Sequence, residues 1–183
     1  MSSATTTPQE RRITVTQGTT QVTTDPNVVL TTVLGSCVAA CLFDGMAGVG
    51  GMNHFLLSEP REGDISFGAQ SERYGAYAME LLINEMLKAG AARSRMKAHL
   101  YGGANMHAGM QEIGSANARF AVDFLVRDKI PLTFSNLGGN SARRVEFRAV
   151  KGQARCRVLA DQIPAEIRLI PTPAASVGDV ELF

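Results

Sequence analysis

The sequence has little of what marks disulfide-stabilised, membrane-spanning or nucleic-acid-binding proteins. Among its 183 residues are three cysteines and no tryptophan, and 18 basic residues are nearly balanced by 17 acidic ones. Three cysteines do not make a disulfide framework. A net charge of +1 gives no reason to expect nucleic acid or an anionic membrane as the main partner. No apolar run approaches the roughly 20 residues that a membrane-spanning helix needs.

The two ends of the chain differ in composition from its middle. Residues 1–11 are rich in Ser and Thr, lack the apolar core of a secretory signal and are expected to form a flexible leader. Residues 161–183 are rich in Pro and small residues and predict a tail that adds nothing to a core. Residues 12–160 are long enough for one domain with a sizeable core. These features together predict a cytoplasmic protein, in which thiols stay reduced.

Hydrophobic periodicity predicts an α+β fold. Residues 71–89 repeat apolar positions with the helical period and end before Gly90, which predicts a long helix. A second helix is expected from about residue 115 to just before Ile130 and Pro131. Short β-branched or continuously apolar runs between turn residues predict strands. These strands are expected at residues 13–17, 28–34, 38–43, 49–57, 96–101, 132–136, 145–150 and 154–159.

Cys37 and His54 are the residues most suggestive of chemistry. Cys37 follows Gly35 and Ser36 just before one predicted strand, and His54 lies on the next strand. If the two strands form a hairpin that turns around residues 45 and 46, the numbers of paired residues add up to about 91, which places His54 directly opposite Cys37. The alternative is that Cys37 is a small buried hydrophobic residue, as free cysteines usually are.

A thiol beside an imidazole is the minimum equipment for covalent acyl transfer. The imidazole of His54 is expected to take the proton of Cys37, which gives a thiolate–imidazolium pair with a lowered thiol pKa. Backbone N–H groups around Gly35 and Ser36 are expected to bind the oxyanion that forms when the thiolate attacks a carbonyl. Thr31, on the preceding strand, is a candidate for orienting the imidazole ring, although threonine is also simply common in strands.

The other cysteines and histidines point to no metal site. Cys41 lies inside an apolar run and is expected in the core, and Cys156 has no histidine near it in the sequence. His99 is expected to be structural, and His107 is a candidate lining residue of a cleft. Since no C-x-x-C or H-x-x-x-H spacing occurs, we expect neither zinc nor any other metal or cofactor.

Several motifs, in a fixed order, resemble the CheD family, the chemoreceptor glutamine deamidases of bacterial chemotaxis. The resemblance runs from about residue 28 to residue 147. The motifs are LGSCVA at 34–39, GMNHFLL at 51–57, RYG at 73–75, MELLIN at 79–84, GGANM at 102–106, IG at 113–114, NARF at 117–120, LGG at 137–139 and RR at 143–144. The sequence departs from the usual family pattern at Asn136, where the family has Asp, and at Ala142, where it has Gly.

The resemblance implies a catalytic triad of Cys37 as nucleophile, His54 as base and Thr31 as the residue that orients the ring. It implies an α/β sandwich related to toxin-type deamidases, with a mixed, largely antiparallel sheet packed against two main helices. The implied substrates are glutamine side chains in the cytoplasmic part of methyl-accepting chemotaxis receptors, which become glutamates. A CheC-type phosphatase is an implied partner, whereas neither nucleic acid nor direct membrane insertion is expected.

Four residues of these motifs are candidates for a substrate or partner surface, namely Asn53, Gly102, Gly103 and Asn105. The main hypothesis is a protein-glutamine deamidase that acts through a thioester on Cys37 and releases ammonia. A second hypothesis is a binding module that regulates a CheC-type phosphatase, with the triad idle or secondary. A third is a general cysteine amidase or peptidase, which predicts hydrolysis of small peptides.

Overall fold

The computed structural model describes residues 10–57, 67–106 and 113–159. Five strands come first along this part of the chain, and the two long helices follow with strands between and after them. The elements are β1 (Arg11–Thr14), β2 (Thr20–Thr23), β3 (Val28–Leu34), β4 (Val38–Asp44), β5 (Val49–Asn53), α1 (Phe67–Lys88), the short 3-10 helix η1 (Arg93–Arg95), β6 (Lys97–Gly102), α2 (Ile113–Arg127), β7 (Leu132–Leu137), β8 (Arg143–Arg148), the short 3-10 helix η2 (Ala149–Lys151) and β9 (Gln153–Val158).

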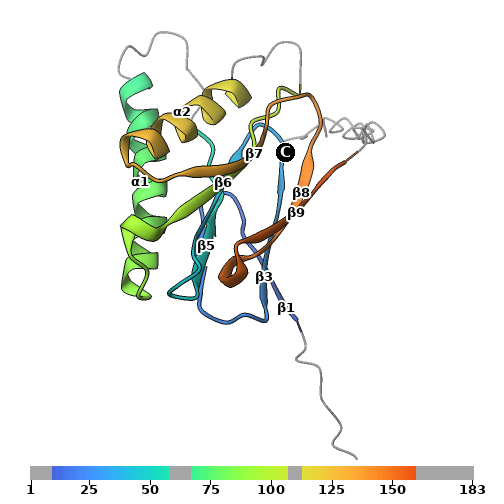
Figure 1. Cartoon of the computed structure of the whole chain (residues 1–183). Coiled ribbons are helices and arrows are strands. Elements are labelled where there is room, and N and C mark those ends of the chain that lie inside the picture. The colour runs from blue at the N-terminus through green and yellow to red at the C-terminus, as the bar shows by residue number, and fades with distance from the viewer. Residues whose placement is uncertain (1–9, 58–66, 107–112, 160–183) are drawn as a thin grey trace, which may run out of the picture.

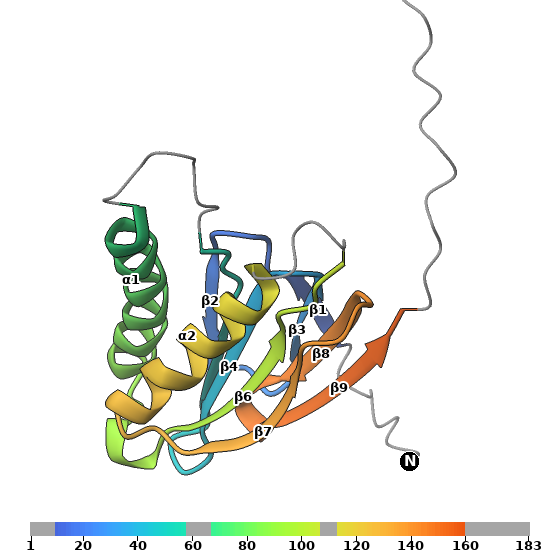
Figure 2. The same ribbon diagram turned by 90° about the horizontal axis from the view of Figure 1, so that it is seen from above.

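The strands form two sheets that pack face to face. One sheet has the order β1-β3-β8-β9 and the other has the order β2-β5-β4-β6-β7. The pairs β1·β3 and β6·β7 are parallel, and the remaining pairs are antiparallel. Helices α1 and α2 cover the outer face of the second sheet, so the molecule is layered as helices, sheet and sheet (Figures 1 and 2).

The predicted α+β class, with two main helices and mixed, largely antiparallel strand pairing, is confirmed. The strands of this fold divide between two sheets. The division begins where β3 ends: the short turn of residues 35–37 carries the chain out of the first sheet and into β4, the middle of the second. This crossing point is where the candidate nucleophile lies.

Two hydrophobic clusters fill the spaces between the layers. Strand β4 contributes to both, since Ala40 and Leu42 point toward the helices while Ala39 and Cys41 point toward the other sheet. Side chains on successive strand residues alternate between the two faces of a sheet, so a strand buried on both faces is apolar throughout. That explains why residues 38–43 are continuously hydrophobic.

The predicted leader and the predicted tail lie almost entirely outside the described residues, and they stay predictions. Between them, the strand predicted at 49–57 ends earlier than expected, at Asn53, and continues only as an isolated bridge between Val38 and Phe55. The predicted long helix is present and begins at Phe67. Within the described residues, neither helix combines the length and the hydrophobicity that crossing a bilayer requires.

Candidate active site

Cys37 lies in the turn that joins the two sheets, and the three residues of this turn are held through their carbonyl groups. The N–H of Ala104 donates to the Gly35 carbonyl at 2.9 Å, and the N–H of Gly103 donates to the Cys37 carbonyl at 2.8 Å. The carbonyl of Ser36 accepts a hydrogen bond of 2.9 Å from the side-chain amide of Asn117. With the carbonyls fixed on this side, the turn has a defined conformation around the thiol.

The turn of residues 35–37 is called the nucleophile turn here, after its candidate nucleophile Cys37. Asn117 links this turn to the segment that follows β5. Its side chain is fully buried, although the face of α2 that carries it is otherwise apolar. Besides donating to Ser36, it accepts a hydrogen bond of 2.7 Å from the N–H of Leu57. A buried amide is costly unless its donors and acceptors are satisfied, so these two bonds fix Asn117 and the turn together.

The residues predicted to form a substrate or partner surface mostly have another role. Asn53 is 1% exposed, accepts from the Ala40 N–H at 2.9 Å and donates to the Ala78 carbonyl at 3.0 Å, so it joins β4 to α1. Gly102 and Gly103 are buried against the nucleophile turn. The predicted surface role of Asn53, Gly102 and Gly103 is therefore wrong.

Gly102 has a steric role beside Cys37. Its φ of +112° lies in the region that favours glycine, and a Cβ there would overlap the Cys37 carbonyl oxygen. Asn105, the fourth of the predicted surface residues, is half-buried and exchanges hydrogen bonds with Ser115 at 2.9 and 3.3 Å. It thereby holds the loop after β6 against the beginning of α2.

The hairpin of β4 and β5 has a different register from the predicted one. Its paired residue numbers add up to 93, as in Cys41 with Met52 and Asp44 with Val49. The register assigns Ala39, not Cys37, as the residue opposite His54, and the predicted direct opposition is wrong by two residues. The reason is the four-residue loop after Asp44, whose carboxylate accepts the N–H groups of Met46 and Ala47.

A shift of two residues keeps side chains on the same face of a sheet, whereas a shift of one would have reversed them. Cys37 and His54 therefore face the same side as diagonal neighbours, a relation that in regular sheets spans about 7–8 Å. The two side chains are not hydrogen-bonded to each other in this structure. The Cys37 thiol instead donates to the side-chain carbonyl of Gln17 at 3.5 Å.

The hydroxyl that contacts the His54 ring belongs to Thr32, one residue after the predicted Thr31. Thr32 Oγ1 lies 3.0 Å from His54 Nδ1, and Thr32 is 3% exposed. The Thr31 hydroxyl points to the opposite face of β3, where it donates to the Ile13 carbonyl at 3.5 Å. The orienting role predicted for Thr31 is wrong in this structure, because neighbouring strand residues face opposite sides.

The hydrogen-bond network around His54 assigns its tautomer. Thr32 Oγ1 donates its proton to the Val15 carbonyl at 2.8 Å, so toward His54 it can only accept. The Val15 carbonyl, an acceptor only, also lies 3.4 Å from His54 Nδ1. Both contacts require the proton on Nδ1. Nε2 therefore carries the free lone pair, and it is buried without a hydrogen-bond partner among the described residues.

Burial keeps both members of the pair neutral at rest. It raises the pKa of the Cys37 thiol, an effect that the backbone N–H of Cys37 partly offsets. It lowers the pKa of His54, against a smaller opposite effect of the Val15 carbonyl. The predicted lowering of the thiol pKa is wrong for this arrangement, in which a thiol faces a neutral imidazole that can act as general base.

The remaining cysteines and histidines stand apart from this pair. Cys41 is fully buried, which raises its pKa, and His99 packs edge-on against Phe43 and Phe134. His107 lies outside the described residues. In the part of the chain that the structure describes, no three His, Cys, Asp or Glu side chains are grouped so that they could hold a metal ion.

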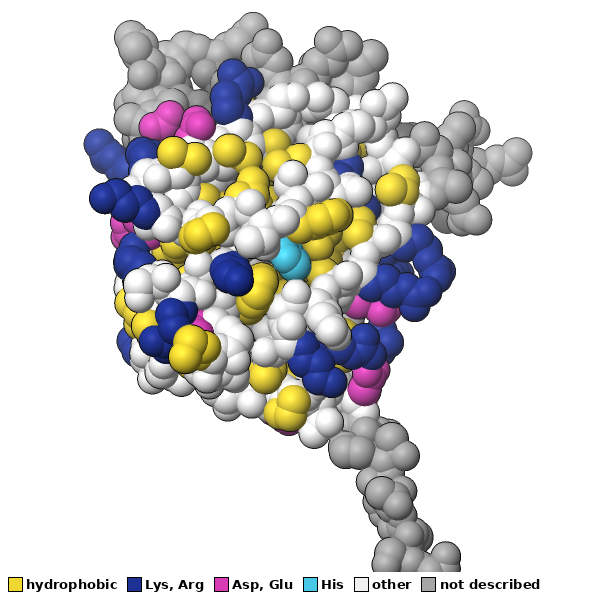
Figure 3. Space-filling model, in the orientation of Figure 1, with side chains coloured by type: hydrophobic (Ala, Val, Ile, Leu, Met, Phe, Trp, Pro, Cys, Tyr) yellow, Lys and Arg dark blue, Asp and Glu magenta, His cyan; other side chains and the backbone are white. Residues whose placement is uncertain are grey.

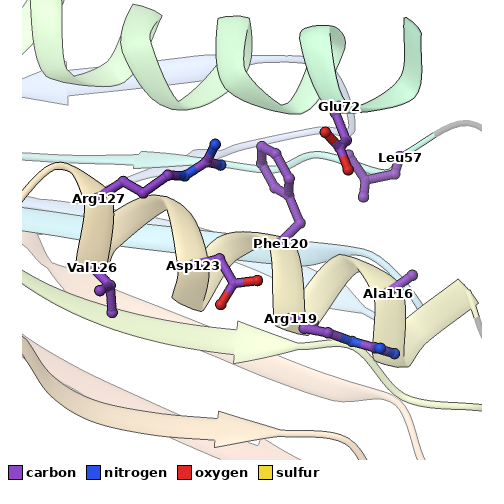
Figure 4. A pocket seen from close by; sticks show the side chains of 8 residues that line it. All are labelled: Leu57, Glu72, Ala116, Arg119, Phe120, Asp123, Val126 and Arg127. Carbon is purple, nitrogen blue, oxygen red and sulfur yellow. The ribbon is translucent and has the colours of Figure 1, made fainter. Parts of the chain in front are cut away.

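A large cleft lies elsewhere, between α1 and α2. It has a volume of about 640 Å³ and contains neither Cys37 nor His54. Figure 4 shows Phe120 and Arg127 of α2 facing the side of α1 that carries Glu72. The cleft lies among the helices that cover the second sheet, whereas the thiol lies where the chain crosses from one sheet to the other.

Sequence reasoning missed Thr32, Gln17 and Asn117 as parts of the site. Thr32 gives no signal that separates it from Thr31, and the contact of Gln17 depends on how a loop folds back. Asn117 does carry a signal, because it is a polar residue on the apolar face of a helix. A buried side-chain amide in such a position needs hydrogen-bond partners, so its presence predicts a contact with another part of the chain.

Comparisons with known proteins identify relatives over nearly the whole chain. A family model described as CheD chemotactic sensory transduction matches residues 56–158. A protein of Caulobacter sp. (strain K31), named probable chemoreceptor glutamine deamidase CheD, is 53% identical over 177 residues, which cover 94% of this chain and 93% of that protein. Proteins with the same name from Zymomonas mobilis (50% identical, 94% and 93% covered) and Agrobacterium fabrum (45% identical, 94% and 97% covered) are also similar.

Two solved structures show a distant likeness. The hypothetical protein YfiH of Bacillus licheniformis is 16% identical, with 72% of this chain and 61% of that chain covered and a TM-score of 0.42. A Neisseria meningitidis protein gives the same TM-score at 11% identity, with 72% and 64% covered. Similarity at this level has no bearing on function.

Proposed function

This chain belongs to the CheD family, and from that premise we propose that it deamidates glutamine side chains of methyl-accepting chemotaxis receptors through a thioester on Cys37. Its relatives are named probable chemoreceptor glutamine deamidases. The observation that carries the proposed chemistry is the unprotonated Nε2 of His54, buried without a partner among the described residues and on the same sheet face as Cys37. The site of reaction is the cytoplasmic part of the receptor.

The proposed reaction begins when the Cys37 thiol turns from Gln17 toward His54, on the same sheet face, and gives its proton to Nε2. The thiolate attacks the carbon of the substrate carboxamide and forms a tetrahedral intermediate whose oxygen is negative. The imidazolium then returns its proton to the leaving nitrogen, and the C–N bond breaks to release ammonia. Neutral His54 next takes a proton from water, and the resulting hydroxide attacks the thioester. The C–S bond then breaks as the imidazolium returns its proton to the sulfur, which gives the Cys37 thiol and a carboxylic acid that ionises to glutamate.

Thr32 and Val15 support the positive charge that forms on His54 during this cycle. Both accept from the Nδ1 side, at 3.0 Å for the Thr32 hydroxyl and 3.4 Å for the Val15 carbonyl. These acceptors hold the ring in one orientation and stabilise the imidazolium that follows proton transfer. The resting state stays a neutral thiol and imidazole, because burial disfavours the charged form of each.

The nucleophile turn supports the negative charge on the substrate oxygen. The carbonyls of Gly35, Ser36 and Cys37 are all engaged by the surrounding scaffold. The backbone N–H of Cys37 favours the thiolate, and it is the donor that we assign to the developing oxyanion in this turn. One such donor is worth on the order of 10²–10³ in rate.

Incubation with a receptor cytoplasmic fragment tests the proposal. We expect ammonia release and a gain of about one dalton at specific glutamines, by exchange of an amide for a carboxyl group. Cys37→Ala should abolish both, whereas Cys156→Ala, which alters the other half-buried cysteine, should leave them intact. Equal turnover by wild type and Cys37→Ala would refute the assignment of Cys37 as the nucleophile. Rapid hydrolysis of small unrelated peptides would instead favour a general amidase.

We further propose that the protein binds a CheC-type phosphatase. Supporting this is an exposed hydrophobic surface at the end strands of the two sheets, where Phe134 of β7 is 50% exposed and Val158 of β9 is 56% exposed. Hydrophobic side chains gather on the face seen in Figure 3, with basic side chains around them. Exposed apolar patches of this kind commonly mark protein contacts.

A pull-down with the phosphatase tests this second proposal. We expect Cys37→Ala to bind the phosphatase and change its activity as well as wild type does, since the half-buried Cys37 is not among the exposed hydrophobic side chains of this surface. Phe134→Ser should weaken binding while glutamine deamidation continues. If neither wild type nor Cys37→Ala binds the phosphatase at micromolar concentration, the partnership is ruled out.

A further inference from the structure

The turn between β1 and β2 is fastened to the backbone of the candidate base. The N–H of Gly18 donates to the His54 carbonyl at 2.7 Å, and the N–H of His54 donates to the Thr19 carbonyl at 3.2 Å. Within the turn, the Thr19 hydroxyl and N–H donate to the Thr16 carbonyl at 2.7 and 3.0 Å. Four hydrogen bonds therefore fix the backbone on both sides of Gln17.

Gln17 extends from this turn to the candidate nucleophile. Its carbonyl Oε1 accepts a hydrogen bond from the Cys37 thiol at 3.5 Å, although the residue is otherwise exposed. Gly18, directly after it, has a φ of +81°, which reverses the chain at the point where the side chain leaves for the thiol. The anchored backbone holds a carboxamide beside the sulfur, and only its side-chain torsions stay free.

The proposed chemistry needs a second hydrogen-bond donor at this place. The tetrahedral intermediate bears its negative charge on an oxygen next to the sulfur, and oxyanion sites commonly combine two donors. The nucleophile turn supplies the N–H of Cys37. A glutamine carboxamide carries two N–H donors and no charge that would oppose an anion. Gln17 is the side-chain amide that contacts the sulfur in the part of the chain that the structure describes.

We propose that Gln17 is a further catalytic residue, whose carboxamide accepts from the Cys37 thiol at rest and donates from Nε2 to the substrate oxyanion after attack. This inference rests on the proposed function, because it presupposes acyl transfer at Cys37. The exchange needs a rotation of the terminal amide about its last side-chain torsion, which is broad and roughly two-fold. The backbone of the turn need not move.

Acyl transfer from a small activated ester separates this role from a structural one. Rapid mixing with p-nitrophenyl acetate follows acylation of Cys37 as a burst of nitrophenolate, with Cys37→Ala as the blank. Alkylation by iodoacetamide, followed at Cys37 by peptide mapping, forms no oxyanion and reports only on the thiol. Receptor deamidation is measured alongside. The variants are Gln17→Ala and Gln17→Glu, and the matched control is Gln21→Ala, another exposed glutamine on the adjacent strand β2.

We expect the burst rate of Gln17→Ala to fall on the order of 10²-fold, while its alkylation rate changes by no more than about threefold. Gln17→Glu should acylate at least as slowly, because a carboxylate repels the oxyanion. Gln21→Ala should match wild type in all three measurements. The deamidation rate of each variant should fall in proportion to its burst rate.

Three results would overturn the inference. One is a wild-type burst rate in Gln17→Ala, and another is an equal fall in burst and alkylation, which would make Gln17 a residue that only positions the thiol. The third is conversion of Gln17 itself to Glu in wild type but not in Cys37→Ala, which would make it a substrate. A normal burst without receptor deamidation would remove the proposed function alone, while absence of any Cys37-dependent burst would remove both.

Discussion

One hydroxyl decides how the His54 ring is held, and the sequence offers two adjacent threonines for the task. Thr32 donates to Val15 and accepts from His54, whereas Thr31 lies on the other face of β3. The choice between them follows from side-chain alternation, because the two threonines are chemically identical but point to opposite faces of the strand. The resemblance to a family could name the kind of residue but not which of the two contacts the ring here.

Replacing each threonine by valine separates the two positions. Thr32→Val removes the acceptor for Nδ1–H, so we expect kcat to fall at least about tenfold, a fraction of the 10²–10⁴ that general base catalysis is worth. Thr31→Val should change kcat less than about twofold, within the range of a surface hydrogen bond. Thr32→Ser should recover most of the activity. Steady-state deamidation kinetics decide, and a larger loss in Thr31→Val would contradict this assignment.

The neutral resting pair predicts a characteristic pH dependence. His54 has a pKa below the ordinary 6.5, so kcat/KM should hold through neutral pH and fall only as the solution becomes acidic enough to protonate the ring. The Cys37 pKa is raised above 9.0, so site-resolved alkylation by iodoacetamide should rise only in alkaline solution. Rapid alkylation well below pH 8 that disappears in His54→Ala would instead reveal a preformed ion pair.

Among the helices and strands, those that the sequence predicts are the ones whose burial produces a clear pattern of apolar residues. Strands β3 and β4 are apolar runs with clear ends, and α1 has an unbroken helical period. Strand β2 was not predicted, because Thr20–Thr23 is mostly polar, and it forms by pairing with β5. The predicted face of Cys37 and His54 was right although the register was not, because the error was an even number of residues.

The end of β6 should be intolerant of any side chain. Gly102→Ala must both adopt a left-handed φ and displace the Cys37 carbonyl, so we expect lower stability together with a loss of Cys37-dependent acylation. Gly90→Ala is the matched control, since Gly90 also has a positive φ, of +101°, but has open space around it. Thermal unfolding should show both variants destabilised, and the burst assay should show acylation lost only in Gly102→Ala.

At the scale of the whole molecule, the site depends on two sheets meeting correctly, and this arrangement is beyond what the sequence alone predicts. The proposed nucleophile comes from the crossing between the sheets, the proposed base directly follows β5 of the second sheet, and Thr32 lies in the first sheet. The pairing of distant strands, such as β3 with β8, depends on the global packing of the chain. Local patterns identify the strands but not their partners.

Asp44 is a test of this global packing, because it ties the β4–β5 hairpin to the segment between α1 and β6. Its fully buried carboxylate binds Arg95 Nη2 at 2.8 Å and the N–H of Ala92 at 2.9 Å. Burial would raise its pKa, but these groups together with the Ala47 N–H outweigh burial and lower the pKa to about 2.

We expect Asp44→Ala to lower the free energy of unfolding by about 1–3 kcal/mol, the cost of leaving N–H groups without their buried acceptor, since the 39% exposed Arg95 can be hydrated in its absence. Exposed Asp123→Ala should change it by less than about 0.5 kcal/mol. Because the folded pKa is lowered, the contribution of Asp44 is complete above the ordinary 3.8 and is lost as the pH falls toward about 2. Urea unfolding across this range measures it, and an equal loss in both variants would contradict the account.

In the proposed mechanism, Cys37 forms a thioester with a receptor glutamine while His54 moves the proton. Rapid acid quench of the reaction with a receptor fragment, followed by intact-mass analysis, tests it directly. We expect a covalent complex whose mass is the sum of the two proteins less one ammonia, with the fragment attached at Cys37. This complex should be cleaved by hydroxylamine, absent from Cys37→Ala and slow to form in His54→Ala. Receptor deamidation that proceeds at the wild-type rate in Cys37→Ala would contradict it.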